Sequence, residues 1–255
     1  MYTLVDLTGM TILVAGASRG IGRDSAIMFS RLGAKLALVA RNEDGLAQTL
    51  SMLDGEGHAY FAHDLADLEG ISQLVKNVVA HSGALDGLFY CAGITNDRPF
   101  MMVKPQEFQK VLTVNLCAFV ELMRCFARKG CYNPGLRVAV MSSIASLVGK
   151  KAHMSYSASK AAINEAVRCM ARELADKHIY VNAIVSGMID TDMYQKYLQD
   201  SGGIDAPSNQ ALLRRQYLGI GKTEDIASVA AFLLSPAAQF ITGACIPVDG
   251  GYTAS

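Results

Sequence analysis

A serine, a tyrosine and a lysine in the chain have spacings that suit chemistry at a carbonyl group. Tyr156 and Lys160 are four residues apart, and Ser143 precedes the tyrosine by thirteen residues. On a helix over residues 153–175, the phenol and the ammonium would lie side by side on one face. A neighbouring cation favours the phenolate of a tyrosine, whose ordinary pKa is about 10, and the serine hydroxyl could bind a substrate oxygen. Such a pair also occurs on exposed helix faces, so its role depends on the elements around it.

The elements that must position these residues alternate between two apolar patterns. Short apolar runs bounded by turn residues predict strands, and apolar residues at helical spacing predict helices. The predicted strands cover residues 10–15, 35–40, 58–62, 85–91, 136–142, 180–185 and 244–248. The predicted helices cover residues 21–32, 45–53, 68–79, 105–128, 153–175 and 223–234. This alternation predicts an α/β fold: a doubly wound parallel sheet of the Rossmann type, in one domain over residues 1–255.

Residues 188–219 follow the sixth predicted strand and include a stretch of loop composition at residues 202–208. A segment beyond the carboxyl end of a parallel strand is well placed to cover a site, so we expect a substrate lid. A tolerated surface insertion explains the same composition equally well.

The composition narrows the classes of partner. Of the 255 residues, 51% are hydrophobic, and 23 basic residues balance 23 acidic ones. Without a charged run, we expect no nucleic-acid or membrane partner. The six cysteines form no C-x-x-C pair and the five histidines have no metal-ligand spacing, so we predict neither disulfides nor a metal site. No segment has the features of a targeting signal, and we expect a cytoplasmic protein.

Three glycines mark the turn between the first predicted strand and helix. Gly16, Gly20 and Gly22 stand in the sequence GASRGIG. Glycine lets the backbone approach a pyrophosphate closely, and the N–H groups that begin a helix carry partial positive charge. In this position the turn predicts a dinucleotide-binding site.

With this G-x-x-x-G-x-G turn and the Tyr156-x-x-x-Lys160 pair together, the chain resembles the short-chain dehydrogenase/reductase family over essentially its whole length. Further segments that match the family pattern are Asp64-Leu65, Ala92-Gly93, Asn115, residues 187–191 and residues 248–251. Each segment is short, but their combination and order are specific.

The resemblance implies four catalytic residues. Tyr156 would be the acid/base, and Lys160 would lower its pKa and hold the nicotinamide ribose. Ser143 would bind the substrate carbonyl or hydroxyl. Asn115 would hold a water in a proton relay that reaches Lys160, although an asparagine bonded only to backbone is the alternative.

The resemblance also implies a set of cofactor-binding residues along the carboxyl edge of the sheet. Asp64 and Leu65 would contact the adenine, and Ile189 and Thr191 would hold the carboxamide and a nearby phosphate. The full set is Gly16, Ser18, Arg19, Gly20, Ile21, Gly22, Arg41, Asp64, Leu65, Cys91, Ala92, Gly93, Tyr156, Lys160, Ile189 and Thr191.

The charge at the end of the second predicted strand favours NADP(H) over NAD(H). Enzymes that use NAD usually have a carboxylate there for the ribose hydroxyls, but this chain has Ala40, followed by Arg41. With Arg19 of the glycine turn, two guanidinium groups suit a 2′-phosphate. Alternatively, both arginines are solvated surface residues, a view that the nearby Glu43 and Asp44 support.

Three positions depart from the common family pattern. Ala15 stands where threonine is usual, and Tyr90-Cys91 stand where two asparagines are usual. Because both sides of a polar contact are replaced together, we expect apolar packing between these strand ends. Ser186 replaces the usual proline before Gly187, which predicts a less rigid turn.

Within the family the chain is most similar to the 3-oxoacyl-acyl-carrier-protein reductases, through GASRGIG, residues 170–174 and the SGMIDTDM turn. This resemblance implies a keto-acyl thioester substrate, a role in fatty acid biosynthesis and a homotetramer. The basic residues that could meet an acidic carrier protein are Arg124, Arg128, Lys129 and Arg172, which also fit an ordinary solvated face. A sugar, steroid or small keto substrate remains an alternative, and a non-catalytic NADP-binding sensor or scaffold is a remote one.

Overall fold

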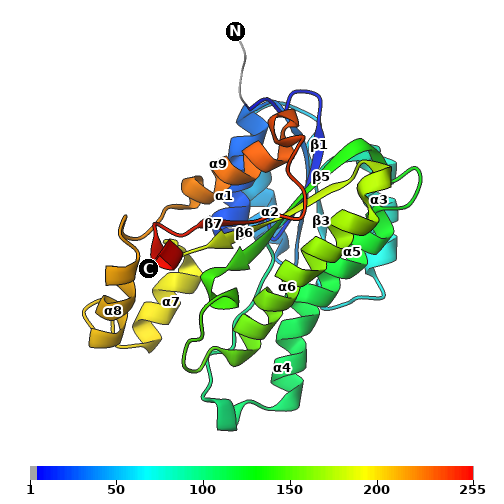
Figure 1. The fold of residues 1–255 in the computed structure, drawn as a ribbon. Helices are drawn as coiled ribbons and strands as arrows, with labels where there is room; N and C mark the ends of the chain where they lie inside the picture. The colour runs from blue at the N-terminus through cyan, green and yellow to red at the C-terminus, as the bar shows by residue number, and fades with distance from the viewer. Residues whose placement is uncertain (1–4, 255) are drawn as a thin grey trace.

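The computed structural model describes residues 5–254 and has seven parallel strands in a single sheet (Figure 1). They are β1 (Thr11–Ala15), β2 (Lys35–Ala40), β3 (Ala59–Ala62), β4 (Leu85–Tyr90), β5 (Tyr132–Ser143), β6 (Tyr180–Ser186) and β7 (Cys245–Val248). The strand order is β3-β2-β1-β4-β5-β6-β7. The predicted doubly wound sheet is therefore confirmed.

Helices cover both faces of the sheet (Figure 1). One face carries α1 (Gly20–Arg31), α2 (Glu43–Leu50) and α9 (Thr223–Leu234). The other carries α3 (Ile71–Ser82), α4 (Pro105–Leu112), α5 (Ala118–Phe126) and α6 (Met154–Glu173). Within residues 5–254, no helix is both long and apolar enough to cross a bilayer.

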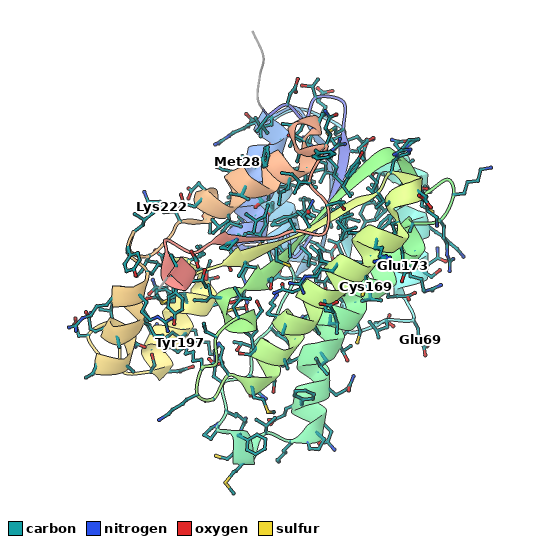
Figure 2. All side chains as sticks on the ribbon, in the orientation of Figure 1. Met28, Glu69, Cys169, Glu173, Tyr197 and Lys222 are labelled. Carbon is teal, nitrogen blue, oxygen red and sulfur yellow. The ribbon has the colours of Figure 1, made fainter. Side chains whose placement is uncertain are left out.

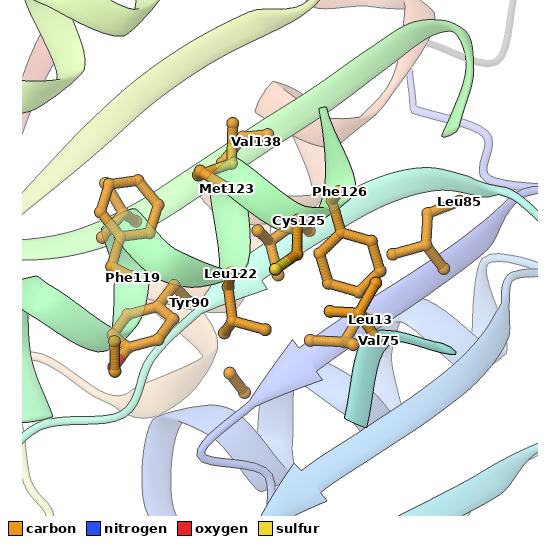
Figure 3. Packing of buried hydrophobic residues seen from close by; sticks show 14 of the residues in the cluster. Leu13, Val75, Leu85, Tyr90, Phe119, Leu122, Met123, Cys125, Phe126 and Val138 are labelled. Atoms are coloured by element: carbon orange, nitrogen blue, oxygen red, sulfur yellow. The ribbon is translucent and has the colours of Figure 1, made fainter. Parts of the chain in front are cut away.

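Alternate strand residues supply the two halves of the core, because successive side chains of a strand point to opposite faces. Ile12 and Val14 of β1 pack against α1 and α9, whereas Leu13 and Ala15 face the other half. In that second half, Leu13 lies beside Val75 and Phe126, and Tyr90 and Phe119 belong to the same cluster (Figure 3). Both faces of every central strand are buried, which explains why these strands read as continuous apolar runs rather than alternating ones.

The predicted helix over residues 105–128 is not continuous. A π-helical turn, η2 (Thr113–Cys117), separates α4 from α5. Such turns widen the helix by one residue per turn and leave backbone groups in need of other partners. The hydroxyl of Tyr90 donates to the carbonyl of Val114 within this turn, and it thereby satisfies one of them.

Two further boundaries differ from the expectation. β5 begins at Tyr132, where Asn133 donates to the carboxylate of Asp86 at 2.8 Å, so the pairing with β4 extends beyond the apolar run. Residues 188–219 contain two helices, α7 (Asp192–Asp200) and α8 (Pro207–Arg215). Polar side chains join the two helices: Asn209 is buried and accepts from the hydroxyl of Tyr197 at 2.7 Å. Tyr197 itself lies on α7 (Figure 2).

The strand order reverses direction between β1 and β4, since the chain winds outwards from β1 on both sides. At such a switch point the connecting loops diverge and leave a crevice at the carboxyl ends of the strands. The predicted site residues follow the carboxyl ends of these strands.

Candidate active site

Ser143, Tyr156 and Lys160 come together at the carboxyl end of β5. Ser143 is the last residue of β5, and α6 carries the other two residues one turn apart. The hydroxyl of Ser143 hydrogen-bonds the phenol of Tyr156. The Nζ atom of Lys160 lies 5.5 Å from the centroid of the Tyr156 ring and donates to the carbonyl of Met141 at 2.7 Å. Ser143 and Lys160 are buried and Tyr156 is half-buried, so the three side chains form one polar group at the edge of the core. The pairing of Tyr156 with Lys160 is the one that their four-residue spacing predicted.

Asn115 lies in the π-helical turn and is completely buried. Its Nδ2 donates to the carbonyl of Ile94 at 3.0 Å and to Oγ of Ser159 at 2.9 Å, and its Oδ1 accepts from the amide of Ile94 at 2.8 Å. The side chain therefore ties the loop after β4 to α6. Both N–H donors of its side chain therefore have protein partners, and its oxygen accepts one hydrogen bond.

The glycine turn has the shape that a dinucleotide requires. A Cβ on Gly16 would lie 2.7 Å from the amide nitrogen of Ala92, and one on Gly22 would lie 2.2 Å from the carbonyl oxygen of Gly16. Gly20 has a φ of +54°. Arg19 precedes α1, and within the described chain no side chain caps the start of this helix, whose first turn also lacks an acidic residue. The free N–H groups therefore fit the pyrophosphate of a nicotinamide dinucleotide.

Substitution of Gly22 by alanine is expected to destabilise the protein by about 3 kcal/mol, because the new methyl group would overlap a backbone carbonyl that cannot move freely. Thermal unfolding would measure the loss. Gly149→Ala is the matched control, since a Cβ there meets no atom within 4 Å. Equal melting temperatures of the two variants would contradict the tight packing of this turn.

The remaining predicted cofactor residues lie along the same edge of the sheet. Ile21, Cys91, Gly93, Ile189 and Thr191 line one cavity with the Ser143, Tyr156 and Lys160 group. The side chain of Leu65, by contrast, is buried in the core beneath this edge.

The two arginines predicted to read a phosphate are at this edge as well. Arg41 follows β2, and its guanidinium lies 3.8 Å from the carboxylate of Asp64. Arg19 lies 3.5 Å from Asp192. The Arg41 and Arg19 side chains are 77% and 74% exposed, so both ion pairs are weak and leave the guanidinium groups available to a ligand.

The cavity above the catalytic group has a volume of about 220 Å³ and is partly open to solvent. Its walls are mainly apolar, with Ile144 and Val148 after β5, Met188 after β6, and Leu212 on α8. On α7, Tyr197 also faces it, and the ammonium of Lys150 lies 3.5 Å from the centre of the Tyr197 ring. This cation–π contact links the segment 188–219 to the opposite wall.

Comparison with known proteins identifies the family to which this arrangement belongs. The family model described as Enoyl-(Acyl carrier protein) reductase matches residues 16–253. The 3-oxoacyl-acyl-carrier-protein reductase of Vibrio harveyi is 33% identical over 247 residues, which cover 97% of this chain and 98% of that protein. A structure from Sinorhizobium meliloti 1021, provisionally named a short-chain alcohol dehydrogenase, has a TM-score of 0.91 and 34% identity, with 98% of each chain covered. The chain belongs to the short-chain dehydrogenase/reductase family.

Membership of the short-chain dehydrogenase/reductase family makes the protein an NAD(P)-dependent oxidoreductase. The relatives of this chain are named for more than one class of substrate. Beside the 3-oxoacyl reductases, the glucose 1-dehydrogenase of Gluconobacter oxydans is 31% identical over 252 residues, which cover 96% of this chain and 92% of that protein.

This dehydrogenase/reductase replaces polar residues at the ends of β1 and β4 by apolar packing and one hydrogen bond. Ala15 and Tyr90 are completely buried, and the Tyr90 ring lies 5.4 Å from that of Phe119. The expected apolar packing is therefore present, but the Tyr90 hydroxyl also supports the π-helical turn. Burial raises the pKa of Tyr90, and it raises the pKa of the neighbouring Cys91 thiol to about 12. Both groups stay protonated at neutral pH.

The turn that begins at Ser186 is held by a residue that the sequence did not point to. Gln216 is buried, and its side chain accepts from the amide of Met188 at 2.8 Å and donates to the carbonyl of the same residue at 2.9 Å. Gly187 also donates to the carbonyl of Val248 at 3.0 Å. These contacts restrain the turn without the usual proline. No local motif marks Gln216, because the residue that it binds is 28 positions away.

Burial sets the proton affinities of the catalytic group. It raises the pKa of Tyr156 to about 12, although the hydrogen bond from Ser143 opposes the rise. It also lowers the pKa of Lys160 to about 8, because an ammonium loses its hydration there. Within the site as described, the phenol is protonated at neutral pH, which is the form that can donate a proton.

Proposed function

We propose that the protein reduces a 3-oxoacyl thioester to the 3-hydroxyacyl thioester with NADPH. The observation that carries this proposal is the largely apolar cavity that ends at Ser143 and Tyr156. An acyl chain can bury apolar surface against Ile144, Val148 and Met188 in this cavity.

The chain's own residues have complementary tasks in this reaction. Ser143 donates a hydrogen bond to the ketone oxygen and holds it beside the phenol. Tyr156 transfers its proton to that oxygen as the carbonyl carbon becomes a secondary alcohol carbon. Lys160 stabilises the phenolate that remains and holds the ribose hydroxyls. The bound nicotinamide supplies the hydride to the carbonyl carbon.

The π-helical turn around Asn115 and the helices of residues 188–219 have separate proposed roles: the turn in returning a proton, and the helices in excluding water. We propose that a backbone carbonyl freed by the π-helical turn binds the water that returns a proton to Lys160. We also propose that α7 and α8 form a lid that excludes bulk water from the hydride transfer, with the Lys150–Tyr197 contact at its edge.

The preference for NADP(H) rests on charge at the end of β2. Arg41 is largely exposed there, and no carboxylate occupies the position of Ala40. A 2′-phosphate would attract Arg41 away from its weak pair with Asp64, and Arg19 could add a second guanidinium contact.

The substrate class also suggests where a carrier protein would dock. Arg124, Arg128, Lys129 and Arg172 are exposed, but Arg124 is paired with Glu121 at 2.7 Å. We therefore propose that the other three residues contribute most to the binding of an acidic carrier protein.

The resemblance to the family also implies an oligomeric state and a location. We propose a cytoplasmic homotetramer, and light scattering would measure its mass.

The rate of reduction should fall as pH rises through about 8. Tyr156, with a pKa of about 12, remains a proton donor throughout, but Lys160 loses its positive charge in this range. Initial rates between pH ~6 and pH ~10 at saturating NADPH would show the decline. Lys160→Arg should abolish this decline in the activity that the variant retains, because a guanidinium group stays charged over this pH range. A flat wild-type profile would contradict the need for this charge.

A direct test of the proposed function follows NADPH oxidation with a panel of keto substrates. The panel contains acetoacetyl coenzyme A, a simple ketone of equal chain length, and a steroid ketone, and glucose is tested with NADP⁺ in the oxidative direction. We expect the highest kcat/KM with the thioester. Glucose is the strongest competitor because of the Gluconobacter relative, and a higher kcat/KM for glucose would replace this proposal with a sugar dehydrogenase.

A further inference from the structure

A polar pair that the catalytic steps do not use lies in the wall of the substrate cavity. His153 precedes α6, and Asp97 belongs to the loop after β4. Both residues line the cavity, and Nδ1 of the imidazole lies 2.9 Å from Oδ1 of the carboxylate. Thr95 donates to the same carboxylate oxygen at 2.6 Å. The His153 side chain is only 14% exposed.

The pair lies directly beside the proposed proton donor. The ring centroids of His153 and Tyr156 are 5.4 Å apart, and the two rings meet edge to face at 69°. His153 is the N-cap residue of α6 and Tyr156 is three positions further along the chain, so the same helix start positions both. A group bound by the imidazole would therefore be adjacent to a carbonyl held at Tyr156.

Asp97 determines which imidazole nitrogen can reach a ligand. Burial by itself would raise the pKa of Asp97, but hydrogen bonds from His153 and Thr95 hold it below the ordinary value, so this carboxylate is charged. It accepts the proton on Nδ1, which leaves Nε2 as the outward nitrogen. No group within residues 5–254 hydrogen-bonds Nε2. A polar nitrogen in a mainly apolar cavity gains most from a ligand that supplies a partner.

We infer that His153 binds the second oxygen of the substrate, the thioester carbonyl that lies one carbon away from the reacting ketone. This inference rests on the proposed 3-oxoacyl substrate. Nε2 donates to the thioester oxygen while Ser143 and Tyr156 hold the ketone oxygen, so the substrate is bound at both ends of its dicarbonyl unit. Both ring nitrogens then act as donors, Nδ1 to the carboxylate of Asp97 at 2.9 Å and Nε2 to the substrate oxygen. Asp97 is accordingly a positioning residue for His153.

Two bound oxygens explain how one catalytic group could distinguish a 3-oxoacyl thioester from a simple ketone. A ketone with no second oxygen leaves Nε2 unpaired, whereas the thioester satisfies it. The other charged or titratable groups around the imidazole are Lys150, in the loop before α6, and Tyr156 itself. Lys150 is directed at the Tyr197 ring, so it leaves the thioester oxygen to His153.

The test compares wild type, His153→Leu and His153→Gln on two substrates: acetoacetyl coenzyme A and 2-pentanone, a ketone with no second oxygen. We expect His153→Leu to raise KM for the thioester about tenfold, with a smaller effect on kcat, and to leave kcat/KM for the ketone within about twofold. His153→Gln keeps a donor amide and should recover part of the thioester KM. Asp97→Asn should raise the thioester KM in the same direction as His153→Leu.

Each other outcome has a definite meaning. Equal losses on both substrates would overturn the inference and assign His153 a structural role, and unchanged KM in all variants would overturn it as well. If His153→Leu does not fold, His153→Gln and Asp97→Asn give the same comparison. If wild type does not reduce acetoacetyl coenzyme A, the proposed function itself fails and this inference fails with it, whereas thioester reduction that is insensitive to changes at His153 overturns the inference alone.

Discussion

Replacement of Tyr156 by phenylalanine is expected to lower kcat about 10³-fold or more while the affinity for NADPH stays within about twofold. Of the two hydroxyl groups proposed to hold the ketone oxygen, the phenol of Tyr156 is the one that can transfer its proton, since the Ser143 hydroxyl is a far weaker acid than a phenol. The ring itself is retained, so its contact with His153 and the packing of α6 should persist. Steady-state kinetics with the best keto substrate and NADPH fluorescence titration would measure the two effects.

Tyr180→Phe is the matched control for this substitution. Tyr180 begins β6 at the opposite end of the sheet, where its ring contacts Arg137, and the phenylalanine ring would preserve that packing. Its kcat should equal that of wild type. Turnover retained by Tyr156→Phe would remove this residue from the mechanism, and a parallel loss of NADPH binding would show that the ring, rather than its proton, is what matters.

Replacement of Arg41 by aspartate is expected to shift the ratio of kcat/KM for NADPH to that for NADH by about 10²-fold towards NADH. The substitution removes a guanidinium contact to the 2′-phosphate and places a like charge beside it, and each lost charge-assisted hydrogen bond alone is worth about 1.5–3 kcal/mol. A carboxylate at this point can instead accept from the ribose hydroxyls of NADH. Because the Arg41 side chain is 77% exposed, the fold should tolerate the change.

The control for this experiment is Arg31→Asp, an identical change of charge at the far end of α1. Arg31→Asp should leave the selectivity for the cofactor unaltered, which separates a local contact from a general change in protein charge. Thermal unfolding would verify that Arg41→Asp, which brings a second carboxylate towards Asp64, remains folded. The same selectivity in all three proteins would show that Arg41 is only a solvated turn residue.

The catalytic group shows where local pattern was sufficient. Tyr156 and Lys160 are on one side of α6 because residues four apart on a helix always are, so their proximity needed no tertiary information. Likewise, glycine is required in the first turn because other backbone atoms lie too close for a Cβ. Gly22 meets the carbonyl of Gly16 a few residues earlier, and Gly16 meets the amide of Ala92 after the adjacent strand. Such features depend on short-range geometry, which the order of residue types specifies directly.

Features that join distant segments were predicted less well. The helix over residues 105–128 reads as continuous by its apolar spacing, but the widened turn around Asn115 depends on partners from the loop after β4 and from α6. The helices of residues 188–219 are short and polar, and their packing depends on Asn209 as much as on apolar contact. A periodicity of hydrophobic residues cannot register hydrogen bonds of this kind.

The sequence by itself determined the alternation of strands and helices, the dinucleotide turn and the helical pairing of Tyr156 with Lys160, because each follows from periodicity or from the freedom of glycine. Only the tertiary structure decided that Asp97 meets His153 beside Tyr156, that Gln216 restrains the turn after β6, and that Tyr90 supports the π-helical turn. These contacts join residues far apart in the chain. Their partners are chosen by the folded sheet and not by neighbours in sequence, so no local pattern could reveal them.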